Sequence, residues 1–118
     1  TRNESSAASD VYKRQKYGPM EVVFMDSGQY NTRWREVHNM PEEVIKGFID
    51  LKGENLIPIH WGMFTLAMHN WFDPPVEIKK RAEEKSISLI TPIIGQVIDM
   101  KNLIDTESWW EKFINVIK

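Results

Sequence analysis

Residues 56–62 of this chain of 118 residues read Leu-Ile-Pro-Ile-His-Trp-Gly, a short apolar run that ends at a histidine. A run of this length, bounded by a turn residue, is typical of a short buried strand. In α/β proteins the loops beyond the carboxyl ends of strands commonly carry ligand sites, and His60 follows the run directly. The segment therefore predicts a sheet with chemistry at His60.

The chain before this segment predicts another strand and a helix. Residues 21–25, Glu-Val-Val-Phe-Met, are apolar and β-branched, which favours a buried strand. Pro41 suits the first turn of a helix, and the carboxylates of Glu42 and Glu43 suit its positive end. The expected apolar face of this helix comprises Val44, Ile45, Phe48, Ile49 and Leu51. We expect Gly53 to end the helix.

The chain after residue 62 continues the alternation of strands and helices. We expect a helical turn at 64–68, a charged helix at 76–85, and two further strands at 88–91 and 96–100. Thr106 is suited to cap a last helix. That helix would carry Trp109, Trp110, Phe113, Ile114 and Ile117. Strands that alternate with helices predict an α/β layer arrangement, with helices covering a sheet.

Composition excludes several classes of function. The chain has a formal net charge of −2, with acidic and basic residues mixed, so no basic stripe is available for nucleic acid. It contains no cysteine, which removes disulfides, thiolate ligands and cysteine nucleophiles. No apolar run approaches the roughly 18 residues that cross a bilayer. A cytoplasmic setting fits these features, while membrane association of a longer parent protein stays open.

The first fifteen residues differ from the rest. Residues 1–9 are small and polar without periodicity, and residues 10–15, Asp-Val-Tyr-Lys-Arg-Gln, resemble the translation of a transposase adapter used in sequencing libraries. We expect 1–15 to be disordered and foreign to the natural protein. The informative domain then covers 16–118.

Three histidines are available for chemistry, and each has a simple structural alternative. His60 is either a metal ligand or a strand-end residue that hydrogen-bonds to the backbone. His38 precedes the helix at Pro41, where it is suited to cap the turn, and His69 is distinguished only by neighbouring aromatic residues. A zinc site needs at least three protein ligands, and the chain has neither an HxH nor an HxxxH pair. The residues alone therefore identify no complete site.

Three stretches together resemble one family. They are Gly-Gln-Tyr-Asn at 28–31 followed by Trp34, His-Asn-Met-Pro-Glu-Glu at 38–43, and Pro-Ile-His-Trp-Gly-Met-Phe at 58–64. Their order and spacing resemble the C-terminal part of metallo-β-lactamase-fold hydrolases related to N-acyl-phosphatidylethanolamine phospholipase D, over about 16–118. The resemblance implies the C-terminal half of an αββα sandwich, with the N-terminal half of the same domain as its missing partner.

The resemblance also implies roles for individual residues. His60 matches the last metal ligand of the family, whose other ligands lie in an upstream HxHxDH motif, a further histidine and a bridging aspartate. His38 matches a catalytic histidine that positions substrate or supports metal-bound water. Gly28, Tyr30 and Trp61 are candidates for substrate contact, although the glycine and the tyrosine equally suit a structural role at the site rim, and the tryptophan suits a core aromatic.

The implied activity belongs to the parent protein, the longer protein of which this chain would be the C-terminal part. Two zinc ions would activate water for attack on a phosphodiester or ester bond in a small-molecule or lipid-like substrate. The chain alone would be inactive, because one ligand cannot fix a metal. Asp26-Ser27 stands where relatives often have Glu-Asn, and Met63 where threonine or lysine is common, so substrate preference does not transfer. The alternative is a complete small α/β binding or accessory module without catalysis.

Overall fold

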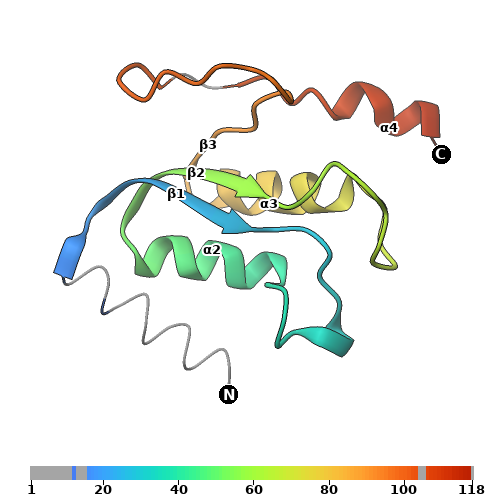
Figure 1. The fold of residues 1–118 in the computed structure, drawn as a ribbon, viewed down its shortest axis with the longest axis horizontal. Helices are drawn as coiled ribbons and strands as arrows, with labels where there is room; N and C mark the ends of the chain where they lie inside the picture. Colours follow the sequence, from blue (N-terminus) through green and yellow to red (C-terminus); the bar gives the residue numbers. More distant parts are fainter. Residues whose placement is uncertain (1–11, 13–15, 104–105, 118) are drawn as a thin grey trace.

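The computed structural model describes residues 12, 16–103 and 106–117, and its centre is a parallel sheet of three strands. In the order β1-β2-β3, the strands are Met20–Asp26, Gly53–Ile59 and Ser88–Leu89. Helices lie in the crossovers between the strands (Figure 1). This arrangement confirms the α/β class predicted from the sequence. The segment 1–15, expected to be disordered, lies outside the described residues apart from Tyr12.

The hydrophobic core lies between the sheet and two helices, α2 (Pro41–Asp50) and α3 (Asp73–Glu84). Its buried residues are Val23, Val44, Ile45, Phe48, Leu51, Leu56 and Ile78. Pro41 is in the first turn of α2, and Val44, Ile45 and Phe48 are buried at helical spacing, as the sequence predicted. Two members of the expected face differ, because Ile49 is 47% exposed and Leu51 is the residue that follows the helix. Burial of side chains of this size stabilises the fold by roughly 1.5–3 kcal/mol each. The core thus fixes the sheet from one side.

The expected end of α2 at Gly53 is wrong. The helix ends at Asp50, Lys52 adopts a left-handed φ of 51°, and Gly53 is already the first residue of β2. A Cβ at Gly53 would lie 2.3 Å from the Phe48 ring. The glycine is therefore needed for close packing of the helix on the strand, and β2 begins three residues before the expected position.

The C-terminal expectations are only partly confirmed. Residues 64–68 form no helical turn, residues 96–100 form no strand, and β3 pairs with β2 only through Ser88 and Leu89. Val97 and Met100 are 90% and 46% exposed, so most of the apolar pattern of 96–100 is left in solvent. Helix α3 begins at Asp73, before the expected residue 76, because two prolines fit a first turn whose amides need no partner.

The last helix, α4 (Glu111–Ile117), begins later than predicted. Thr106 does not cap it, because its hydroxyl accepts a hydrogen bond from the Thr91 amide. Trp109 and Trp110 precede the helix, and Trp110 is completely buried. The segment that ends in α4 runs on the other side of the sheet from α2 (Figure 1). Within the described residues, no helix has the length and hydropathy that a bilayer crossing requires.

Candidate functional site

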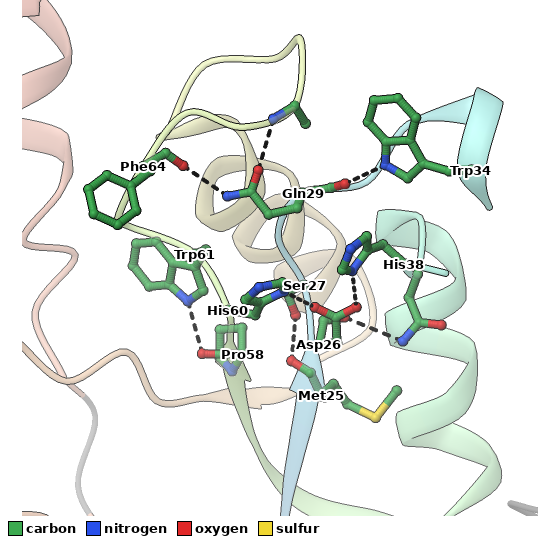
Figure 2. Close-up of polar contacts among 12 residues, drawn as sticks. Met25, Asp26, Ser27, Gln29, Trp34, His38, Pro58, His60, Trp61 and Phe64 are labelled. Carbon is green, nitrogen blue, oxygen red and sulfur yellow. Dashed lines mark hydrogen bonds and ion pairs between the residues drawn. The ribbon is translucent and has the colours of Figure 1, made fainter. Parts of the chain in front are cut away.

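The parallel pairing of β1 and β2 brings Asp26 and His60 to the same edge of the sheet. Asp26 pairs with Ile59, and the Ser27 amide donates to the Ile59 carbonyl at 3.0 Å. His60 is the next residue after β2, and His38 comes from the loop before α2. Three side chains that are far apart in the sequence therefore meet beyond the strand ends (Figure 2).

Asp26 connects the two histidines. Its Oδ1 lies 2.9 Å from Nδ1 of His60, and its Oδ2 lies 3.1 Å from Nδ1 of His38. The centroids of the two imidazole rings are 5.1 Å apart. A carboxylate only accepts hydrogen bonds, so it favours the tautomer with the proton on Nδ1 in both rings. Nε2 of each ring then carries a free lone pair, which is the form of imidazole that a metal requires.

This group can supply part of the donor set of a divalent metal ion. One ligand atom from each of Asp26, His38 and His60 lies within 4.8 Å of the others. Imidazole nitrogen and carboxylate oxygen are ordinary zinc ligands, and a metal-bound histidine commonly donates its second N–H to a carboxylate. The residues are compatible with histidine ligation through Nε2, with Asp26 as the orienting group.

The backbone at His60 is held in an uncommon conformation. Its φ of 67° is left-handed, which a residue with a side chain adopts at a cost of roughly 1–2 kcal/mol. Gly28 makes this arrangement possible, because a Cβ there would lie 1.8 Å from the His60 carbonyl oxygen. The structure thus locates Gly28 against the backbone of the metal-ligand candidate, where the loops after β1 and β2 touch.

A pocket of about 350 Å³ opens beside the two histidines. It is lined by Gln29, Trp34, Val37, His38, His60, Leu66 and Ala67. Most of this wall is apolar, and its polar part consists of the two imidazoles and Gln29. Such a pocket suits a ligand with an apolar portion next to a polar or charged group.

Tyr30, a candidate for substrate contact, does not line this pocket. Its ring stacks on His69, with centroids 4.2 Å apart. Burial raises the pKa of Tyr30 to about 12, and the carboxylates of Asp73 and Glu77 act in the same direction. The phenol is therefore neutral at pH 7 and acts as a hydrogen-bond donor or packing group.

Trp61 lies in an aromatic cluster on the other side of the His60 loop. Its Nε1 donates to the Pro58 carbonyl at 2.9 Å, and its ring centroid is 5.5 Å from those of Trp109 and Trp110. These contacts are those of a packed aromatic residue, the structural alternative to substrate contact for Trp61. Of the five site residues named from the sequence, the structure brings His38 and His60 together at the pocket.

Two functional candidates were missed in the sequence. Asp26 was noted only as a departure from its relatives, and Gln29 only as the variable residue of a Gly-x-Tyr turn. The signal for Asp26 was its place at the end of a predicted strand, since parallel neighbours bring their carboxyl ends to one edge. The contacts of Gln29 join residues 35 to 38 positions apart, which no local pattern indicates.

No family model matches the chain. An uncharacterized protein of Mycobacterium tuberculosis is 32% identical over 97 residues, which are 80% of this chain and 26% of that protein. N-acyl-phosphatidylethanolamine-hydrolyzing phospholipase D of Saccharomyces cerevisiae is 31% identical over 65 residues, covering 53% of this chain and 14% of the enzyme. N-acyl-phosphatidylethanolamine-hydrolyzing phospholipase D 1 of Caenorhabditis elegans is 26% identical over 90 residues, covering 70% of this chain and 25% of that protein. The chain spans about a quarter of the length of the mycobacterial relative.

Proposed function

We propose that residues 16–118 are the C-terminal part of a zinc-dependent hydrolase with the metallo-β-lactamase fold, which cleaves a phosphodiester or ester bond. The observation that carries the proposal is the meeting of Asp26, His38 and His60 at the edge of a parallel sheet, beside an apolar pocket. The similarity to two hydrolases named for phospholipid cleavage supports it. The parent protein, by which we mean the complete natural protein that contains 16–118, provides the remaining ligands.

The fold of the described residues is consistent with half of an αββα sandwich. Both α2 and α3 pack on one face of the sheet, whereas Phe24 on the opposite face of β1 is 58% exposed. In the proposed parent, the other half of the domain covers this face and supplies metal ligands for two zinc ions. The similarity of the chain to about a quarter of a longer mycobacterial protein supports such a partner half.

Each residue of the group has a distinct role in the proposal. His60 binds metal through Nε2, while Asp26 holds its Nδ1–H and so fixes the ring. His38 lines the pocket and donates its Nδ1–H to the same carboxylate, which leaves its Nε2 as an acceptor that positions substrate or supports the attacking water. When bound, zinc supplies Lewis-acid activation of water and of the scissile bond at neutral pH.

The pocket favours a substrate with an apolar group beside the cleaved bond. Trp34, Val37 and Leu66 provide apolar surface within the same cavity as the two imidazoles. A lipid-like phosphodiester or ester combines these chemical properties. The names of the yeast and nematode relatives support this class of substrate.

Substitution of the three histidines in the parent protein tests the proposal. Zinc content is measured by mass spectrometry and turnover with bis(4-nitrophenyl) phosphate. His60→Ala should lose zinc and reduce turnover by more than about 100-fold. Loss of a residue that only supports a metal ligand costs up to about 100-fold, and loss of the ligand itself should cost more. His38→Ala should reduce turnover more than zinc content.

His69→Ala is the matched control, because His69 stacks on Tyr30 and is outside the pocket and the metal group. It should retain both zinc and turnover. Full zinc and normal turnover in His60→Ala, with unchanged circular dichroism, would contradict the assignment. A wild-type parent with neither zinc nor turnover would instead favour the non-catalytic binding module.

A further inference from the structure

Gln29 ties together three segments around the pocket. Its Nε2 donates to the Phe64 carbonyl at 2.9 Å, and its Oε1 accepts from the Ala67 amide at 2.9 Å. Its own carbonyl accepts from Nε1 of Trp34 at 2.7 Å. Figure 2 shows the side-chain amide reaching from the loop after β1 to the loop that follows His60.

The middle of the loop that Gln29 holds, residues 63–66, is exposed, whereas the loop is packed on either side of it through Trp61, Ala67 and His69. Residues 61–70 contain neither helix nor strand, and Phe64 and Leu66 are 72% and 74% exposed. Leu66 and Ala67 nevertheless form part of the pocket wall. An exposed segment with few buried contacts opens easily, so the position of 63–66 depends on the hydrogen bonds that hold it. The Gln29 amide contributes two of these bonds.

The backbone of Gln29 is adapted to this contact. Its φ of 60° is left-handed, a region that glycine and asparagine enter more readily than glutamine. A residue with a long side chain persists there when the surrounding contacts compensate for the strain. Here the three hydrogen bonds compensate, and each side-chain bond needs the full length of the glutamine.

We propose that Gln29 is a specificity-determining residue: its amide holds residues 64–67 so that Leu66 and Ala67 form an apolar wall of the pocket beside His38 and His60, which favours substrates with an alkyl chain. The inference rests on the proposed hydrolase function for its substrate class. The position of the wall is a separate property, which is measurable without turnover.

The first experiment measures amide hydrogen exchange in the parent protein by mass spectrometry, on peptides that cover 63–68. Gln29→Ala should exchange about tenfold faster than wild type in this peptide. Gln29→Asn tolerates the left-handed φ but is one methylene shorter, so it should also exchange faster. Gln96→Ala is the matched control, because Gln96 accepts a bond from the Ile93 amide and does not line the pocket. Wild-type exchange in Gln29→Ala would overturn the proposal.

The second experiment compares 4-nitrophenyl octyl phosphate with 4-nitrophenyl methyl phosphate. Hydrolysis adds water across a P–O bond of either diester and releases 4-nitrophenolate and an alkyl phosphate. The ratio of kcat/KM for octyl to that for methyl should fall about tenfold in Gln29→Ala, mainly through the KM of the octyl diester. The ratio should be unchanged in Gln96→Ala. An unchanged ratio in Gln29→Ala would overturn the specificity role even where loop exchange increases.

The failure of the proposed function is distinguishable from the failure of this inference. If the wild-type parent hydrolyses neither diester, the hydrolase proposal fails. Calorimetry with octyl phosphate and methyl phosphate then decides the role of the wall. An approximately tenfold loss of octyl over methyl preference in Gln29→Ala sustains it, and an equal preference in variant and wild type overturns it.

Discussion

One carboxylate controls the orientation of both imidazoles at the candidate centre. Each oxygen of Asp26 accepts from a different histidine, at 2.9 and 3.1 Å, so neither ring turns without losing a charge-assisted bond. The Nδ2 of Asn39 also donates to the Asp26 carbonyl at 3.4 Å, which links the His38 loop to the end of β1. The resemblance gave roles to His38 and His60 but none to Asp26, and Asp26 is the residue that joins them.

Replacement of Asp26 in the parent protein should reveal this orienting role. Asn has one acceptor oxygen, and its NH₂ group cannot accept from a second Nδ1–H, so one ring must change tautomer or turn. Asp26→Asn should weaken zinc binding by about 10–100-fold, as for other residues that orient metal ligands. Nitrogen NMR of the metal-free protein should show the change of tautomer directly.

Asp26→Glu is the control for this prediction. It retains the carboxylate, and glutamate is common at the matching position of the family that the chain resembles. Its zinc affinity should stay within about tenfold of wild type, below the loss expected for the amide. Equal zinc affinities and unchanged tautomers in Asp26→Asn would show that the carboxylate does not orient the rings.

Tyr30 provides a test of the local environment at high pH. Burial, assisted by Asp73 and Glu77, raises its pKa to about 12, so the folded state favours the neutral phenol. A raised pKa contributes stability below the ordinary value near 10, and this contribution is lost as the pH rises toward 12. Absorbance titration should contain a step near pH 12 that Tyr30→Phe lacks. Assignment of a step near pH 10 to Tyr30 would contradict the burial.

At the scale of elements, the strand ends depend on one close backbone contact. Gly28 and the His60–Trp61 backbone touch where the loops after β1 and β2 meet. This contact, with the bond from Ser27 to Ile59, extends the pairing of the strands beyond Asp26. The distance between Asp26 and His60 is therefore set by main-chain packing as well as by their own hydrogen bond.

Gly28→Ala should separate the two loops. The added Cβ would lie 1.8 Å from the His60 oxygen, and backbone cannot yield as a flexible side chain does. We expect the free energy of unfolding to fall by about 3 kcal/mol, at the upper end for overpacking. Gly95→Ala is the control: nothing lies within 4 Å of its Cβ, so only its φ of 90° opposes the change, at about 1 kcal/mol. Urea unfolding of the parent variants measures both, and equal losses would contradict the close contact.

The elements also show which features the sequence could predict. Helix α2 was predicted because Pro41, two glutamates and an apolar face indicate the same start and register. Its end was missed because Gly53 serves packing against Phe48 rather than helix termination. The strand expected at 96–100 has the right residue types, but a strand also needs a partner, which local sequence does not reveal.

The candidate site follows the same distinction. His60 and His38 were identified by resemblance, since their local motifs are distinctive. Asp26 and Gln29, by contrast, act through contacts with distant residues. Asp26 contacts His60, and Gln29 contacts Phe64, in each case more than 30 positions later in the chain. Such contacts arise from strand register, so they become visible only when the sheet is assembled.

At the scale of the whole molecule, the sheet is covered unevenly. Successive side chains of a strand point to opposite faces, so Val23 enters the core while Phe24 points away from it. Ile57, which pairs with Phe24, is buried, but Phe24 and Ile59 are 58% and 43% exposed. In the described sheet β1 is also an end strand, and its far edge has no strand partner there.

This uneven cover predicts that the isolated chain of 118 residues associates and binds a dye for apolar surfaces such as anilinonaphthalene sulfonate. Exposed apolar area on an open sheet edge is the combination that promotes association, because a second chain can bury the side chains and pair the edge at once. Phe24→Thr removes the aromatic ring but keeps a residue suited to strands, so it should lower both dye binding and association.

Ile94→Thr is the matched control, since Ile94 is 82% exposed in a loop and far from β1 in the sequence. If the exposure of a side chain alone determined association, Ile94→Thr would lower association more than Phe24→Thr. If the open sheet face determines association, Phe24→Thr will lower it more. Sedimentation velocity and dye fluorescence at matched concentrations separate the two, and a monomeric wild-type chain that melts sharply without binding dye would contradict the open face and favour a complete module.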